Sequence, residues 1–294
     1  MSASFSIVIP TYRRAALLER TLPSYLATEA IQIVVVDDAS GSPHGPVLAR
    51  LAALDPRIAL VTLDRHAGLP GARNEGVARA RGEWVVFGED DVWFPRRYPT
   101  TLIAHAVEAG ARIAGGRVLL VHPSGLDRPV EALESTIRDA LVTGHPPDRF
   151  LRAAWPVRRL PNGDVRTPLL AATSAVHRSV FERVRFDPAF RGNAFREETD
   201  FFLSCAEAGI ASIHCPHAGC GHLKEHTRAT PGGSWTMGRP RYALQMAANN
   251  WRLVRKHRHL LEEVRRGAGR PAGSFIMQGE FLLSMLQRLR PARP

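Results

Sequence analysis

Lysine is almost missing from this basic chain. The 294 residues carry a formal net charge of +11, yet lysine occurs only at Lys224 and Lys256, so nearly all of the positive charge is arginine. The arginines are spread along the sequence and cluster only near the C-terminus. Segments that bind nucleic acid are usually blocks of like charge, whereas most of the charge here is spread along the chain. The net charge is therefore weak evidence for a partner, and we expect no nucleic-acid partner.

Cysteine is scarce as well. Three cysteines are too few for a disulfide framework, which is consistent with a reducing compartment. Two of them stand in a segment rich in zinc-type ligands: Cys215, His217, Cys220, His222 and His226. Their spacing matches no standard zinc ribbon or finger, so the sequence leaves open whether this group binds zinc.

Long hydrophobic runs are also absent. The apolar stretches are far shorter than the ~20 residues that span a bilayer, and residues 1–14 lack the basic start and apolar core of a secretory signal. We therefore expect a cytoplasmic protein. Peripheral attachment to the inner membrane face through a basic helix near the C-terminus is the alternative.

Strand and helix patterns alternate from the N-terminus, and 45% hydrophobic residues suffice for a full core. This alternation is typical of a doubly wound α/β sheet. After the first strand, Leu18, Leu22, Tyr25 and Leu26 recur at helical spacing, and Pro23 is expected to kink this first helix or delay its start. The predicted strands are 5–9, 31–36, 58–63, 112–121, 169–176 and 211–214. The predicted helices are 47–54, 77–81, 98–110, 180–184, 241–259 and 275–289.

Residues 82–95 contain an apolar run that ends in Glu89, Asp90 and Asp91. A strand of this kind delivers its carboxylates to the edge of the sheet where open α/β folds bind ligands. Adjacent carboxylates repel one another unless a cation offsets their charge. Mg²⁺ and Mn²⁺ prefer such oxygen ligands and usually bridge to substrate phosphates. The plain alternative is a solvated acidic turn.

This segment resembles the metal-binding motif of family 2 glycosyltransferases with the GT-A fold. In that family an apolar strand runs into Asp-x-Asp-Asp, followed by an aromatic residue and proline. Asp90 and Asp91 match the last two acidic residues, and Gly88 stands where the first is usual. The resemblance implies that Mn²⁺ or Mg²⁺ depends mainly on Asp91, with His222 as a second ligand.

The stretch from Gly68 to Gly76 is similar to a second motif of the family, Gly-x-x-x-Ala-Arg-Asn-x-Gly. We expect it to be a glycine-rich turn whose free N–H groups suit an anion, leading into a helix at Val77. Asp38 has a plain alternative as a turn-capping residue. The residues that the resemblance assigns to the donor nucleotide are Pro10, Thr11, Tyr12, Arg13, Asp38, Gly68, Arg73, Asn74 and Asp90.

The catalytic base falls in an acidic helix start. The family usually has Glu-Asp-x-Asp here, and its second acidic residue, the general base, corresponds to Glu198. Glutamate in place of aspartate lengthens the arm by one methylene. Glu197, Asp200 and Trp235 are expected to support the base or contact the acceptor. The plain alternative is a helix N-terminus that acidic residues stabilise through the dipole.

The resemblance implies a Rossmann-like GT-A sheet with helices on both faces and a C-terminal helical extension. Residues 1–120 would bind the nucleotide sugar and 121–225 would hold the acceptor and the base. Residues 226–294 would form a flexible loop, which could act as a lid, and C-terminal helices able to pair two copies.

The implied activity is inverting transfer of a sugar from a nucleotide-diphosphate sugar to a hydroxyl or amine. A soluble small molecule or glycan is the expected acceptor, with a lipid-linked one as the alternative. A nucleotidyltransferase would need a glycine-rich basic loop after the first strand, which Pro10 to Arg13 does not supply. A catalytically silent sugar-nucleotide-binding module stays open because of Gly88. The sequence does not specify the base, the sugar or the acceptor.

Overall fold

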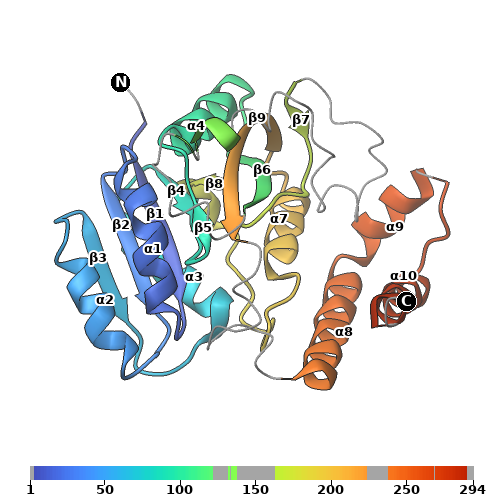
Figure 1. The fold of residues 1–294 in the computed structure, drawn as a ribbon. Coiled ribbons are helices and arrows are strands. Elements are labelled where there is room, and N and C mark those ends of the chain that lie inside the picture. The colour runs from blue at the N-terminus through green and yellow to red at the C-terminus, as the bar shows by residue number, and fades with distance from the viewer. Residues whose placement is uncertain are drawn as a thin grey trace.

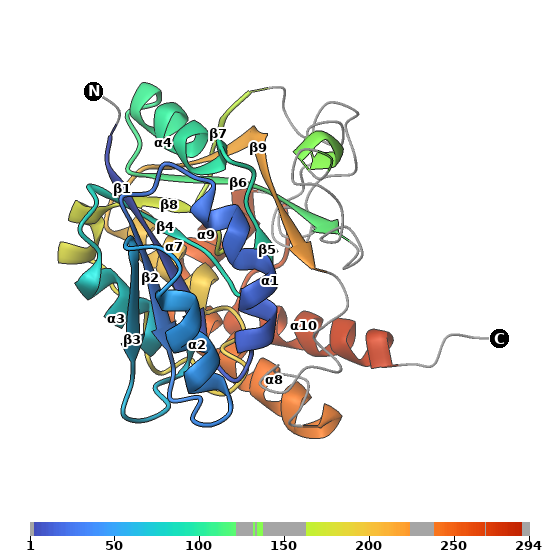
Figure 2. The same ribbon diagram turned by 60° about the vertical axis from the view of Figure 1, so that its left-hand side comes forward.

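A single mixed sheet forms the centre of the protein (Figures 1 and 2). The computed structural model describes residues 3–121, 132, 134–137, 163–223, 238–267 and 269–289. Its strand order is β3-β2-β1-β4-β8-β6-β9-β5, and β7 pairs with β9. The strands are β1 Phe5–Thr11, β2 Gln32–Asp37, β3 Ile58–Thr62, β4 Trp84–Phe87, β5 Val92–Trp93, β6 Ile113–Val121, β7 Val165–Arg166, β8 Ala175–His177 and β9 Ser212–Leu223.

The first four strands of this order are parallel, whereas β8 runs antiparallel between β4 and β6. Helices cover both faces of the sheet: α1 Ala15–Leu26, α2 His44–Ala52, α3 Gly68–Arg79, α4 Tyr98–Glu108 and α7 Glu197–Glu207. A 3₁₀ helix, η2, spans Arg178–Glu182. The C-terminal extension consists of α8 Arg239–Lys256, α9 Arg258–Gly267 and α10 Ser274–Leu289.

Residues within one strand face opposite layers, because side chains in a strand alternate. Ile7 and Ile9 of β1 pack in a core with residues of α1, α2 and α4. Val8, between them, packs in a second core with residues of α3 and α7. Both cores are apolar and buried, so β1 is covered on both sides. The predicted α/β sheet with helices on both faces and C-terminal helices is confirmed.

One local prediction in the first half was wrong, and one of two alternatives in another was excluded. The glycine-rich stretch is not a turn before a helix, because α3 already begins at Gly68. A Cβ on Gly76 would lie 2.2 Å from Cγ1 of Val8, so glycine lets this helix pack directly on β1. Pro23 lies inside α1, which already begins at Ala15, so Pro23 does not delay the start of the helix, and the alternative that it kinks the helix stays a prediction.

The second half differs more from its prediction. Only the end of the strand expected at 169–176 is formed, because the Ser174 hydroxyl donates to the carbonyl of Ala171 and closes a turn. β9 is much longer than 211–214, since it pairs with β6 along most of its length. The helix expected at 241–259 is two helices that meet at the buried His257.

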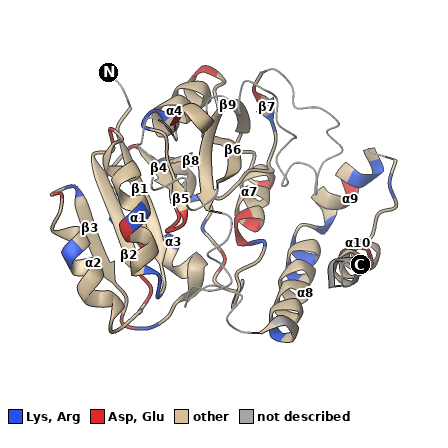
Figure 3. Ribbon diagram, viewed as in Figure 1, with Lys and Arg blue, Asp and Glu red and all other residues tan. Residues whose placement is uncertain are grey.

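Arginine is plentiful on α8 and α9 (Figure 3), and α10 exposes Phe275 and Leu283. None of the helices in the described ranges combines the length and the apolar character needed to cross a bilayer. Pairing of two copies through these helices and the three predicted regions of the chain stay predictions. The proposed lid with Trp235 lies outside the described residues.

Candidate active site

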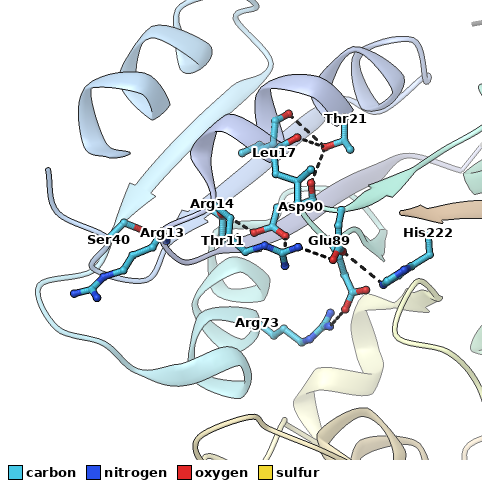
Figure 4. A network of polar contacts seen from close by, with 12 residues as sticks. Thr11, Arg13, Arg14, Leu17, Thr21, Ser40, Arg73, Glu89, Asp90 and His222 are labelled. Atoms are coloured by element: carbon cyan, nitrogen blue, oxygen red, sulfur yellow. Dashed lines mark hydrogen bonds and ion pairs between the residues drawn. The ribbon is translucent and has the colours of Figure 1, made fainter. Parts of the chain in front are cut away.

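The ends of β1 and β4 meet at one edge of the sheet, where Asp90 and Asp91 follow β4 (Figure 4). Thr11, the last residue of β1, donates a hydrogen bond from Oγ1 to Oδ2 of Asp90 at 2.9 Å. Arg14, just before α1, forms an ion pair with each aspartate at 2.7 Å. The sequence analysis missed Arg14, which supplies part of the positive charge that these adjacent carboxylates need.

Arg14 divides its charge between two carboxylates that differ in acidity. Burial raises the pKa of Asp90 to about 7, although Arg14 opposes the shift. Burial acts in the same direction on Asp91, yet Arg14 and His222 together hold the pKa of Asp91 below its usual range. Asp91 is therefore the more acidic of the two carboxyl groups and is ionised at neutral pH, as a metal ligand must be.

Glu89, Asp91 and His222 offer one ligand atom each, and these atoms lie within 4.8 Å of one another. His222 comes from β9, which pairs with β5 so that Val92 and His222 are neighbours. Its Nε2 lies 3.7 Å from Oδ1 of Asp91. Its buried Nδ1 has no hydrogen-bond partner within the described residues. Two carboxylates and an imidazole with an unused nitrogen fit a divalent ion such as Mn²⁺ or Mg²⁺.

Glu89 was not among the predicted metal ligands, which were Asp91 and His222. The surroundings of Gly88 explain why the carboxylate of Glu89, and not one at residue 88, joins the triad. A Cβ on Gly88 would lie 2.8 Å from Cε1 of Tyr25, so the tyrosine ring occupies the space of a side chain at 88. The Tyr25 hydroxyl donates to the carbonyl of Glu89 at 2.7 Å and accepts from its N–H at 3.1 Å. Tyr25 thus excludes an aspartate at 88 and fixes the backbone of Glu89 instead.

We expect Gly88→Ala to lower the free energy of unfolding by about 1–3 kcal/mol, the usual cost of inserting a methyl group into a packed core. Urea unfolding measures this loss. Gly45→Ala is the matched control, because a Cβ there meets nothing within 4 Å and alanine favours the helix. Equal stability of Gly88→Ala and the wild type would contradict the contact with Tyr25.

Arg73 of α3 connects the metal motif with the start of α7. Its side chain is fully buried, and its Nη2 and Nε lie 3.0 Å from Glu89 and Glu197, respectively. The guanidinium also lies over the rings of Phe87 and Phe186. Its Nη1 has no hydrogen-bond partner within the described residues. Arg73 reaches the site through these carboxylates, and its contact with a nucleotide stays a prediction.

The acidic residues at the start of α7 lie in three different environments. Glu197 is buried and bonded to Arg73, and burial raises its pKa to about 8 against the pull of that arginine. Glu198 is only half-buried, and burial raises its pKa as well. Asp200 is fully buried and bonds Lys256 at 2.8 Å and His257 at 3.0 Å. Glu198 is thus the most accessible of the three, and Asp200 belongs to the contact with α8.

The residues predicted to bind the nucleotide lie in two places, around the loops that follow β1 and β2 and at the contact of α3 with the turn ahead of α7. Near the ends of β1 and β2, Asp38 accepts hydrogen bonds from the N–H groups of Ala67 at 2.6 Å and Gly68 at 2.9 Å. Nδ1 of His66, a residue that the sequence analysis missed, lies 2.9 Å from the same carboxylate, and its ring packs at a tilt against Tyr12. These contacts match the turn-capping alternative for Asp38 and hold the loop before α3.

Arg13 and Asn74, two further residues predicted to bind the nucleotide, each take part in a hydrogen bond that shapes a turn. Arg13 has a positive φ of 56°, and its N–H donates to Oγ of Ser40 at 2.8 Å, so the chain turns sharply after β1. The Asn74 side chain bonds both the carbonyl and the N–H of Phe186. Asn74 therefore fixes the turn ahead of α7, while Pro10 and Thr11 lie within β1.

Comparisons with known proteins show which sequences and structures this chain resembles. Residues 6–145 match the family model described as Glycosyl transferase family 2. The succinoglycan biosynthesis protein ExoO of Rhizobium meliloti (strain 1021) is 39% identical over 112 residues, which are 37% of this chain and 31% of that protein. The succinoglycan biosynthesis protein ExoW of the same strain is 29% identical over 234 residues, 74% of this chain and 68% of that protein. The match thus spans about a third of ExoO and two thirds of ExoW.

A solved structure is similar over most of the chain. The mannosyltransferase PcManGT from Pyrobaculum calidifontis, in complex with GDP-Man and Mn²⁺, has a TM-score of 0.56 and 19% identity. The similarity covers 87% of this chain and 64% of that one. At such low identity, the likeness shows a shared fold.

Proposed function

We propose, from the premise that this chain belongs to glycosyl transferase family 2, that it transfers a sugar from a nucleotide-diphosphate sugar to an acceptor with inversion. Its sheet and helices have the GT-A fold of the solved transferase. One observation carries the proposal. Arg73 links the triad of Glu89, Asp91 and His222 to the acidic start of α7, so a cation-binding group and a candidate base occupy one edge of the sheet.

The relatives support the proposed classes of donor and acceptor. The structure of PcManGT holds a nucleotide sugar and Mn²⁺, which supports a donor of this chemistry for our chain. ExoO and ExoW are named for the biosynthesis of succinoglycan, which favours a glycan as the acceptor. The loop after β1, with Tyr12 and Arg13, and the Asp38 loop would hold the nucleoside.

Glu89, Asp91 and His222 would hold the divalent ion. When bound, the ion would neutralise charge on the diphosphate leaving group. Arg14 keeps Asp91 ionised and in place, since it pairs with both aspartates. Tyr25 keeps the backbone of Glu89 fixed through two hydrogen bonds. The alternative of a catalytically silent sugar-nucleotide-binding module rests on Gly88, which stands where the family usually has its first aspartate. The neighbouring Glu89 offers a carboxylate to the ion in its place, and this weakens the alternative.

Glu198 would act as the general base. A base must be reachable by the acceptor hydroxyl, and Glu198 is the half-buried residue between the buried Glu197 and Thr199. Its raised pKa, caused mainly by burial, strengthens it as a proton acceptor. The proton leaves the acceptor oxygen as that oxygen attacks the face of the sugar opposite the nucleotide, so the configuration at the anomeric carbon inverts.

Asp91→Asn tests the metal assignment. We expect its affinity for Mn²⁺ to fall by more than about tenfold, because even residues that only orient metal ligands are worth roughly 10- to 100-fold. Titration calorimetry with a nucleoside diphosphate, with and without Mn²⁺, measures the metal-dependent part of binding. Asp64→Asn, an exposed aspartate on the loop after β3, is the matched control. Unchanged metal-dependent binding by Asp91→Asn would refute the assignment.

A further inference from the structure

A second group of metal-type ligands lies away from the candidate active site. His105 of α4, Asp164 just before β7 and Cys215 of β9 each offer one ligand atom, and these atoms lie within 4.8 Å of one another. Nδ1 of His105 is 2.8 Å from Oδ2 of Asp164. Three segments far apart in the sequence thus converge on one point. Figures 1 and 2 both show α4, β7 and the start of β9 together at the top of the view.

We propose that His105, Asp164 and Cys215 form a zinc site. Zinc combines imidazole nitrogen, carboxylate oxygen and thiolate sulfur in four-coordinate tetrahedral sites, with water taking any open position. Metal–ligand bonds of about 2.0–2.3 Å place the ligand atoms of such a site roughly 3.3–3.8 Å apart. The three ligand atoms here lie within 4.8 Å of one another, so the group is compact enough to converge on one ion. Mg²⁺ and Mn²⁺ prefer oxygen ligands, so the thiol distinguishes this site from the triad at Asp91.

The exposure of the three side chains would allow an ion to enter the site from solvent. The side chains of His105 and Asp164 are 30% and 23% exposed, whereas Cys215 is fully buried beneath them. The ion would displace the thiol proton into solvent, and His105 would bind through Nδ1 with its proton on Nε2. Thiolate and carboxylate together carry two negative charges, so bound Zn²⁺ makes the site neutral and reduces its desolvation cost.

A hydrolytic Cys–His–Asp arrangement does not fit the same residues. A nucleophilic thiol has to be accessible and to ionise readily, but Cys215 has no exposed surface. Burial and the nearby Asp164 carboxylate raise the pKa of the Cys215 thiol to about 11. The buried thiol therefore lacks the access that a nucleophile needs, whereas its convergence with His105 and Asp164 fits metal ligation.

The structure also separates Cys215, Cys220 and His222, which the sequence groups together, whereas His226 lies outside the described residues. Cys220 lies elsewhere on β9, with its thiol 3.5 Å from Oγ1 of Thr173, and His222 belongs to the Asp91 triad. On the neighbouring strand β6, His214 and His222 pair with Gly115 and Leu120, which are five residues apart, so roughly 16 Å separates the two positions at the rise of a strand. The zinc site is therefore distinct from the candidate active site.

Cobalt is the probe that tells the two sites apart, because Co²⁺ bound to a thiolate absorbs in the near ultraviolet and Co²⁺ bound to carboxylates and imidazole does not. We expect chelator-treated wild-type protein to gain this band at one Co²⁺ per chain and to lose it when Zn²⁺ is added. Cys215→Ser should abolish the band. Cys220→Ser, which alters another buried thiol, and Asp91→Asn should both keep it.

Asp164→Asn provides a variant at a partly exposed side chain that leaves the thiol in place. It should weaken Zn²⁺ binding more than about tenfold in competition with a chromogenic chelator while its circular dichroism stays that of the wild type. Absence of a thiolate band in the wild type, or its persistence in folded Cys215→Ser, would overturn the proposal. So would a wild-type zinc affinity in Asp164→Asn. These outcomes are independent of whether the chain transfers a sugar.

Discussion

Glu198→Gln should lose about 10² to 10⁴ in turnover, the usual worth of general base catalysis, while its affinity for the nucleotide stays nearly constant. Glutamine keeps the size and packing of glutamate but cannot accept a proton from the attacking hydroxyl. Glu198 is the accessible acidic residue at the start of α7, and its pKa is raised mainly by burial. Steady-state kinetics with a confirmed donor and acceptor, together with calorimetry for the nucleotide, measure both quantities.

Glu197→Gln is the matched control one residue away. Glu197 is 1% exposed and its Oε1 is 3.0 Å from Nε of Arg73, so an acceptor cannot reach it. We expect this variant to lose stability and to keep most of its turnover at a temperature where it remains folded. If Glu197→Gln lost turnover and Glu198→Gln kept it, the base would be the neighbouring residue. Full turnover in both would assign proton removal to another group.

Arg73→Met should lower the free energy of unfolding by about 3–5 kcal/mol, the cost of removing one partner from a buried ion pair. Arg73 is fully buried between Glu89 and Glu197, so its loss leaves two carboxylates without their cation. Urea unfolding measures the effect, provided that the dependence on urea is the same in both proteins. Arg65→Met removes an exposed arginine and should change stability by less than about 0.5 kcal/mol.

A second substitution separates charge from packing in this network. The double variant Arg73→Met with Glu197→Leu removes both members of the buried pair, and such apolar replacements are often neutral. We expect it to regain most of the lost stability, because Glu89 is partly exposed and can be hydrated. A double variant no more stable than Arg73→Met would show that the stability comes from the guanidinium packed on Phe87 and Phe186.

β1, β2 and β4 could be predicted because each contains a continuous apolar run that is buried on both faces. β1 and β2 are such runs, and they extend only one or two residues beyond their predicted ends. β9 could not be predicted at its full length, since Pro216 interrupts the pattern and its partners on β6 lie about a hundred residues earlier. Pairing over such distances leaves little trace in local sequence.

The same limit applies to the candidate site. Asp91 and His222 were predicted as ligands, and the structure brings them together. Glu89 was missed because its place depends on Tyr25, whose ring fills the space beside Gly88 from a position 63 residues earlier. Asp200 was expected to support the base, but Lys256 and His257 of the C-terminal extension bind it. Local motifs name the chemistry, whereas distant contacts decide which side chain performs it.

The contact between Gly88 and Tyr25 also constrains how this motif can evolve. An aspartate at 88 would collide with the tyrosine ring, so that substitution alone is costly. A smaller residue at 25 would leave a cavity beside Phe94 and free the backbone groups of Glu89, which is costly as well. The two changes compensate only when made together. The effects of substitutions at 25 and 88 are therefore coupled, because the two residues are in contact, and we expect glycine at 88 to occur together with tyrosine at 25.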